Sequence, residues 1–109
     1  MKLWQQYIAE REDAKIIFTD HSFVTYRNLD ESRLLVLDLF VEREYRKTGL
    51  VEKMWDEMIE KEKPYIVFGT TDTSALNWEA SNRFMISFGF IPYKTDQDII
   101  HYYREINHG

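Results

Sequence analysis

Three consecutive segments in the middle of the chain constrain the fold more than any other part of the sequence. The first, 33–41, is apolar after Arg33 except at Asp38, which predicts a strand in the middle of a sheet that is covered on both sides. From about 48 to 62, apolar pairs recur every four residues opposite a charged face, as in an amphipathic helix. The apolar run 65–69 then predicts a second buried strand. A strand, a helix and a strand in this order form a βαβ unit, so the two strands should run parallel.

The remaining segments predict smaller elements around this unit. The fold class is therefore α+β, in three layers: a mixed, mostly antiparallel sheet with the parallel βαβ unit at its centre and helices on both faces. A chain of 109 residues supports one core, so residues 1–109 should form a single domain. The further elements are a helix over about 2–11, strands over about 15–18 and 23–28, a helix from about Leu76 that is closed by Gly89, and strands at 90–93 and 99–103 around a Lys94–Asp98 turn.

Composition excludes several classes of function. Without cysteine, the chain has no disulfide, no cysteine-ligated metal and no thiol nucleophile. Its histidines, His21, His101 and His108, have no second ligand at a chelating interval, so no metal site is expected. No apolar run reaches the roughly 18 to 20 residues that span a bilayer, and we expect a cytoplasmic protein without membrane contact. The net charge of −5 works against nucleic-acid binding and slightly favours cationic partners such as amines.

The most informative junction lies between the first of the central strands and the helix that follows it. A short basic turn ends at Gly49, where the helix pattern begins. Backbone amides at a helix start have no internal partners, so this junction can bind a phosphate, with Gly49 allowing close approach and with Arg46 and Lys47 adding charge. The same residues are equally typical of an ordinary strand–helix turn with solvated basic side chains.

This junction resembles motif A of the GNAT superfamily of N-acetyltransferases, whose signature is Gln/Arg-x-x-Gly-x-Gly/Ala. Arg46, Gly49 and Val51 occupy its three places. The segment 80–90 is similar to the later helix of that family, which typically ends in an aromatic pair, a few residues and Gly-Phe. The element order agrees from about residue 15 to 106, so the chain looks like a small, truncated member.

The resemblance implies that acetyl-CoA binds as cosubstrate, without a metal, in a V-shaped opening where the two central strands splay apart. Main-chain groups of one strand would pair with the pantetheine arm, and amides at the helix start would hold the pyrophosphate. An amine, deprotonated through water by a base, would attack the thioester while an acid protonates the departing thiolate. The implied cofactor-binding residues are Leu39, Phe40, Val41, Arg46, Lys47, Thr48, Gly49, Leu50, Val51 and Asn77.

The chain departs from the family pattern at three positions. Val51 replaces a small residue and would either crowd the cofactor or face the core. Met85 stands where the family often places its tyrosine acid, and a thioether cannot donate that proton. The asparagine that commonly opens the later helix is best matched by Asn77, one residue out of register, with Asn82 as the weaker match. Protonation would then use water or a different acid, or the protein would not catalyse.

Two carboxylates are the candidates for the catalytic base. Asp38 is the only ionisable side chain in its strand after Arg33, and burial would raise its pKa towards a useful range. The alternative for Asp38 is a structural hydrogen bond to a neighbouring loop or amide. Glu42, at the end of the strand, is the second candidate. Tyrosines of the last two strands could supply an acid or simply cover the half-buried surface: Tyr93, Tyr102 and Tyr103.

The sequence therefore favours an acetyl-CoA-dependent N-acetyltransferase that acts on an amine of a protein or of a small cationic acceptor. The alternative is a catalytically inactive protein of the same fold that retains the CoA pocket and acts through protein contact. A structural domain without a cofactor would require both motif matches to be chance. Strand edges near 99–106 could pair between copies, which makes a homodimer a further expectation.

Overall fold

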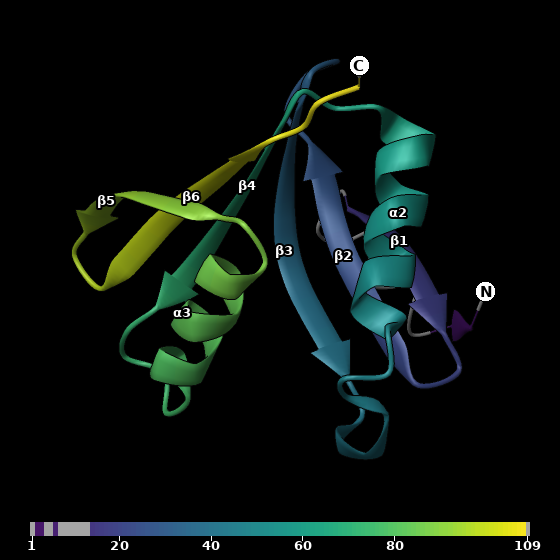
Figure 1. Ribbon diagram of the computed structural model, residues 1–109, viewed down its shortest axis with the longest axis horizontal. Helices are drawn as coiled ribbons and strands as arrows, with labels where there is room; N and C mark the ends of the chain where they lie inside the picture. The colour runs from purple at the N-terminus through teal and green to yellow at the C-terminus, as the bar shows by residue number, and fades with distance from the viewer. Residues whose placement is uncertain (1, 4–5, 7–13, 109) are drawn as a thin grey trace.

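The computed structural model describes residues 2–3, 6 and 14–108 (Figure 1). Most of the helix expected over 2–11 lies outside the described residues. From residue 15 onward, each expected helix and strand is present, with ends that shift by a few residues. The elements are β1 (Lys15–Thr19), β2 (Ser22–Asn28), β3 (Arg33–Val41), the 3-10 turn η1 (Arg43–Tyr45), α2 (Leu50–Glu62), β4 (Ile66–Asp72), α3 (Trp78–Ser87), β5 (Ile91–Asp96) and β6 (Ile99–Glu105).

The six strands form one mixed sheet in the order β1-β2-β3-β4-β6-β5. Only β3 and β4 pair in parallel, and the other neighbours are antiparallel. The predicted α+β class, with a mixed and mostly antiparallel sheet, and the central βαβ unit are thus confirmed. The expectation of an exposed edge near residues 99–106 is wrong, because β6 pairs with β4 on one side and with β5 on the other. The edge strand at this end of the sheet is β5.

β3 and β4 pair only over a short stretch and then diverge (Figure 1). Their register joins Arg33–Leu35 to Ile66–Phe68. Beyond it, β3 stays paired with β2 as far as Val41, whereas β4 follows β6. The register of β2 with β3 also shifts between Thr25 and Tyr26, and such bulges bend a strand. The result is a V-shaped divergence at the carboxyl end of β3.

This divergence corrects one expectation about the central strand. The sequence predicted cover on both faces, but Asp38, Leu39 and Phe40 are exposed. They lie beyond Leu35, where β3 has lost its neighbour on the β4 side. An apolar sequence shows that a strand can be buried on both faces, but it does not show whether a neighbouring strand is present to bury it.

The core fills the sheet face that α2 covers. α2 contacts β1 and β2, and α3 contacts β4 and β5. The segment after α3 meets α2 through Trp55, whose ring lies edge-on to Phe88 at 5.3 Å and to Phe90 at 5.7 Å. The guanidinium of Arg104 lies 4.7 Å from the centre of the Trp55 ring, an arrangement that favours a cation over an aromatic face. The largest fully buried side chains include Tyr26, Tyr102, Leu34, Met54, Met58 and Val67.

Three details at the ends of helices and strands can be compared with the sequence pattern. Gly89 closes the later helix with a φ of 90°, as predicted. Leu76, expected on the buried face of that helix, precedes α3 and is 98% exposed. The turn expected over 94–98 is shorter, because pairing of β5 with β6 continues to Asp96 and Ile99. Within the described residues, neither helix has the length and apolar character that a membrane span requires.

Candidate functional site

The predicted anion site is a loop between the end of β3 and the start of α2. We call residues 46–49 the anion loop. Lys47 and Gly49 both have left-handed backbones, with φ of 63° and 87°. Gly49 is the residue that precedes the first turn of α2, and its carbonyl accepts the amide of Lys53 at 3.0 Å. Glycine at this position adopts the required φ without steric cost.

The start of α2 is open. No side-chain hydrogen bond from a described residue caps it at Gly49. A Cβ built on Gly49 would meet no atom within 4 Å. Val51 and Leu50 pack against the core cluster, so Val51 faces the core and leaves the space before the helix clear. Free amides, a glycine and open space in front of a helix start fit a phosphate group.

Two hydrogen bonds hold the anion loop against the end of β3. Nε of Arg46 donates to the carbonyl of Val41 at 3.1 Å, and the hydroxyl of Thr48 donates to the carbonyl of Tyr45. The Nε–H of the Arg46 guanidinium therefore binds the end of β3, while the side chain of Lys47 is exposed. Lys47 therefore offers an exposed cation to a ligand at this junction.

The register decides which main-chain groups of β3 face the divergence. The amide of Glu42 donates to the carbonyl of His21 at 2.9 Å, on the β2 side. Because main-chain groups alternate along a strand, those of Phe40 also point to β2, and those of Leu39 and Val41 point towards the divergence. Main-chain pairing with pantetheine was expected for Leu39, Phe40 and Val41. For Phe40 this expectation is corrected, because its main-chain groups point to β2. The carbonyl of Val41 is also excluded, because it already accepts a hydrogen bond from Arg46.

The two candidate bases lie in different surroundings. Asp38 is exposed, so the burial that was expected for it is absent. It accepts a hydrogen bond from Oγ1 of Thr25 at 3.2 Å, a structural partner of the kind that the alternative foresaw. Oε2 of Glu42 lies 3.2 Å from Nδ1 of His21. His21 stacks on Tyr45 with ring centres 3.6 Å apart.

The place of His21 in this cluster was not predicted from the sequence. Residue 21 lies between two predicted strands, and its side chain was considered only as a metal ligand. The signal that could have found it is the strand register, since a turn between β1 and β2 must lie beside the end of β3 if β2 pairs with β3 along its full length. That register cannot be read from the sequence alone.

The three residues that the sequence singled out at or near α3 have different surroundings. Asn82 accepts a hydrogen bond from the buried Tyr102 hydroxyl at 2.5 Å, which commits both to the core. Asn77 is exposed at the start of α3, where its carbonyl accepts the amide of Ser81. Met85 lies against β4, since a Cβ on Gly69 would fall 2.6 Å from its Cε. No side-chain proton donor stands at position 85.

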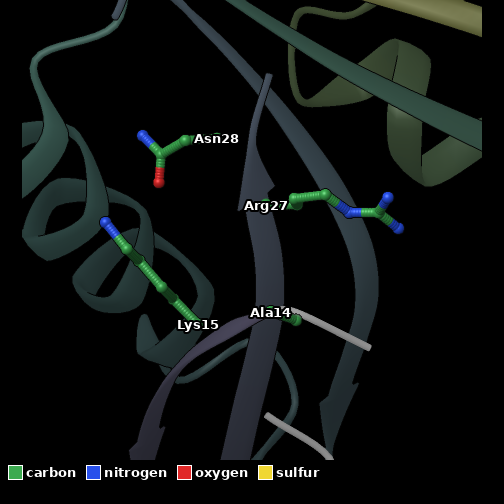
Figure 2. A pocket seen from close by; sticks show the side chains of 4 residues that line it. All are labelled: Ala14, Lys15, Arg27 and Asn28. Carbon is green, nitrogen blue, oxygen red and sulfur yellow. The ribbon is translucent and has the colours of Figure 1, made fainter. Parts of the chain in front are cut away.

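A separate hollow of about 290 Å³ lies at the other end of α2 (Figure 2). It is lined by Ala14, Lys15, Arg27 and Asn28. Lys15 and Asn28 point towards α2, whereas Arg27 points away from them across the sheet (Figure 2). Lys15 pairs with Glu62 at 3.0 Å. The polar groups do not converge on a shared point, so this hollow is no competing ligand site.

Two of the side chains that line this hollow are hydrogen-bonded to Glu62. Its carboxylate accepts hydrogen bonds from Tyr26 at 2.8 Å, from Lys15 and from Asn28. Burial alone would raise the pKa of Glu62, but these hydrogen bonds together outweigh it, so that pKa lies below its usual value. Burial, followed by the Glu62 contact, raises the pKa of the Tyr26 hydroxyl. The network fastens the C-terminal end of α2 to β1 and β2.

Comparison with known proteins supports the fold. No family model and no curated protein matches the sequence. The PaiA N-acetyltransferase of Thermoplasma acidophilum, solved with coenzyme A, is 14% identical with a TM-score of 0.70, over 96% of this chain and 70% of that one. A GNAT acetyltransferase of Elizabethkingia anophelis with acetyl-CoA bound is 8% identical with a TM-score of 0.66, over 94% and 83%. One from Staphylococcus aureus Mu50 is 18% identical with a TM-score of 0.64, over 79% and 60%. The GNAT resemblance is thus confirmed as a fold.

Proposed function

We propose that this chain, which has the fold of the GNAT acetyltransferases, binds acetyl-CoA and transfers its acetyl group to an amine of a protein or of a small cationic acceptor. The observation that carries the proposal is the open start of α2 at Gly49, beside the divergence of β3 and β4. Similar structures that were solved with coenzyme A or acetyl-CoA bound support it.

The residues of the junction would hold the cosubstrate mainly through main-chain groups. Amides at the anion loop and the first turn of α2 would donate to the pyrophosphate, and Lys47 would add a positive charge. Main-chain groups of β3 that face the divergence would pair with the pantetheine arm. The proposed binding residues are Leu39, Val41, Arg46, Lys47, Thr48, Gly49, Leu50, Val51 and Asn77.

Acetyl-CoA supplies an activated acetyl thioester, and the acceptor must reach it as an uncharged amine. Asp38 is the proposed base: it is an exposed carboxylate on the part of β3 that has left β4, and it would take the ammonium proton through water. Glu42 is the second candidate. With Met85 at the position of the usual acid, the departing thiolate would take its proton from water.

Met85 also favours a second candidate function, a catalytically inactive protein that binds CoA and acts through protein contact. Both candidates share the pocket and differ in turnover. We propose a cytoplasmic location for either one, consistent with a chain that has no cysteine. A homodimer would form through the exposed edge of β5, because β6 is paired on both sides.

Calorimetric titration of acetyl-CoA into wild type, Gly49→Asp and Gly49→Asn tests the binding site. Aspartate and asparagine have the same shape and tolerate a left-handed backbone similarly, so the pair isolates the charge. We expect saturable binding by wild type, retention in Gly49→Asn and loss in Gly49→Asp. Equal binding by the two variants, or none by wild type, would refute the pyrophosphate site. Thiol release with a panel of amines then separates the enzyme from the inactive binder.

A further inference from the structure

We propose that His21 is a positioning residue that holds the anion loop ready for the pyrophosphate. This inference rests on the function proposed above. His21 lies in the turn between β1 and β2 and touches the segment that leads from β3 into the anion loop.

Three contacts join His21 to that segment. Its ring is stacked on Tyr45 with centres 3.6 Å apart and planes inclined by 6°. Its Nδ1 lies 3.2 Å from Oε2 of Glu42, and its carbonyl accepts the amide of Glu42 at 2.9 Å. Glu42 immediately precedes η1 and Tyr45 is its last residue, so His21 contacts both ends of this turn.

The turn that carries His21 is itself fastened to α2. The amide of His21 donates to Oγ1 of Thr19 at 3.2 Å. The hydroxyls of Thr19 and Ser22 lie 2.6 Å apart, and that of Ser22 contacts the sulfur of the buried Met54 at 3.3 Å. Met54 belongs to the helix whose first amides face the proposed ligand. His21 therefore connects the segment before the anion loop with the helix after it.

The anion loop needs such support from outside. All four residues of the loop are exposed, and Lys47 and Gly49 both have left-handed φ. An exposed loop of this kind loses conformational freedom when it binds a ligand, and any contact that orders it beforehand improves affinity. A stacked ring pair is suited to this task because it fixes the direction in which the chain continues from Tyr45.

Stacking should matter more than charge here. The His21 and Glu42 side chains are 38% and 51% exposed, and exposed ion pairs contribute little. A role in proton transfer fits less well, because β3 lies between His21 and the divergence. A metal role lacks support, because the described residues contain no group of three ligating side chains.

The test is the affinity for acetyl-CoA of wild type, His21→Ala, His21→Phe and Tyr45→Leu, measured by calorimetry on the whole chain. Removing the stacked pair should weaken binding about five- to tenfold. Tyr45→Leu should lose at least as much as His21→Ala, because Tyr45 also packs against the core, and the double variant should lose no more than Tyr45→Leu, because the stacking contact is already absent in it. His21→Phe keeps a stacked ring without the Glu42 contact and should bind within about twofold of wild type, since the exposed pair contributes little.

The outcomes distinguish this inference from the proposed function. Wild-type binding with an unchanged affinity in His21→Ala overturns the positioning role alone. Additive losses in the double variant, or a His21→Phe variant as weak as His21→Ala, also overturn it. Absence of binding by wild type overturns the proposed function and this inference with it. Thermal unfolding without ligand identifies a variant that has lost its fold, and Tyr45→Leu then tests the same contact from its other side.

Discussion

Replacing Glu62 should destabilise the protein by an amount that can be worked out from its contacts. The side chain is 9% exposed and accepts hydrogen bonds from Tyr26, Lys15 and Asn28. In Glu62→Ala, the Tyr26 hydroxyl loses its partner inside a residue that is fully buried, which costs about 1–3 kcal/mol. The half-exposed Lys15 pair adds about 0–1 kcal/mol. We therefore expect a loss of about 1–4 kcal/mol in the free energy of unfolding.

Urea unfolding measures this loss. With an m-value of about 2 kcal/mol/M, the midpoint of Glu62→Ala should fall by about 0.5–2 M while m stays constant. Glu62→Gln is the matched control, because its amide oxygen still accepts from Tyr26 and only the charge is removed. Its loss should be clearly smaller. If Glu62→Gln is as unstable as Glu62→Ala, the hydrogen bond from Tyr26 is not the main contribution.

The pH dependence of Glu62 provides a second check. Its folded-state pKa is lower than its value of 4.5 in the unfolded chain. The stabilisation by the ionised carboxylate is therefore complete above pH 4.5, the pKa in the unfolded chain, and it is lost as the pH falls through the lower folded-state pKa. The stability difference between wild type and Glu62→Gln should be constant near neutral pH and should narrow in acid below pH 4.5. A difference that does not change with acidification would refute the assigned direction of the shift.

Three further predictions concern the region where the strands diverge. Gly69→Ala should cost no more than about 1 kcal/mol in urea unfolding, because the atom that lies 2.6 Å from the added Cβ is the terminal Cε of the flexible Met85 side chain, which can move aside; a loss of about 3 kcal/mol would mean that Met85 is held in place. Met85→Tyr should raise the rate of thiol release about tenfold or more if the wild type lacks only a general acid, whereas Met85→Phe should not; equal rates would contradict that role for position 85. Asp38→Asn should lower kcat and leave the affinity for acetyl-CoA unchanged, while Thr25→Val, which removes only its hydrogen-bond partner, should lower kcat less; unchanged turnover in Asp38→Asn would rule out Asp38 as the base.

Much of the fold from residue 15 onward could be predicted because the relevant signals are local. The four-residue recurrence of apolar pairs predicted α2, and its Met54 and Met58 are among the most buried residues. The parallel pairing of β3 with β4 followed from the helix between them. The left-handed Gly89 and the helix start at Gly49 followed from where the helical pattern begins and ends.

The candidate site was predicted less completely, because its geometry depends on contacts between segments. The anion loop was located from its own residues. The exposure of Asp38 was not, because it depends on where β4 leaves β3. The backbone direction of Phe40 depends on the register with β2. The contacts of His21 depend on the same register.

By itself, the sequence determined which segments become helices and strands and which junction offers unpaired amides, because periodicity and glycine placement act within a few residues. Only the tertiary structure decided that β3 and β4 separate after Leu35, that β6 lies inside the sheet, and that a histidine of a distant turn stacks against Tyr45. The physical reason is that an apolar or polar side chain specifies how much contact it favours, whereas the neighbour that provides the contact is selected by packing of the whole chain.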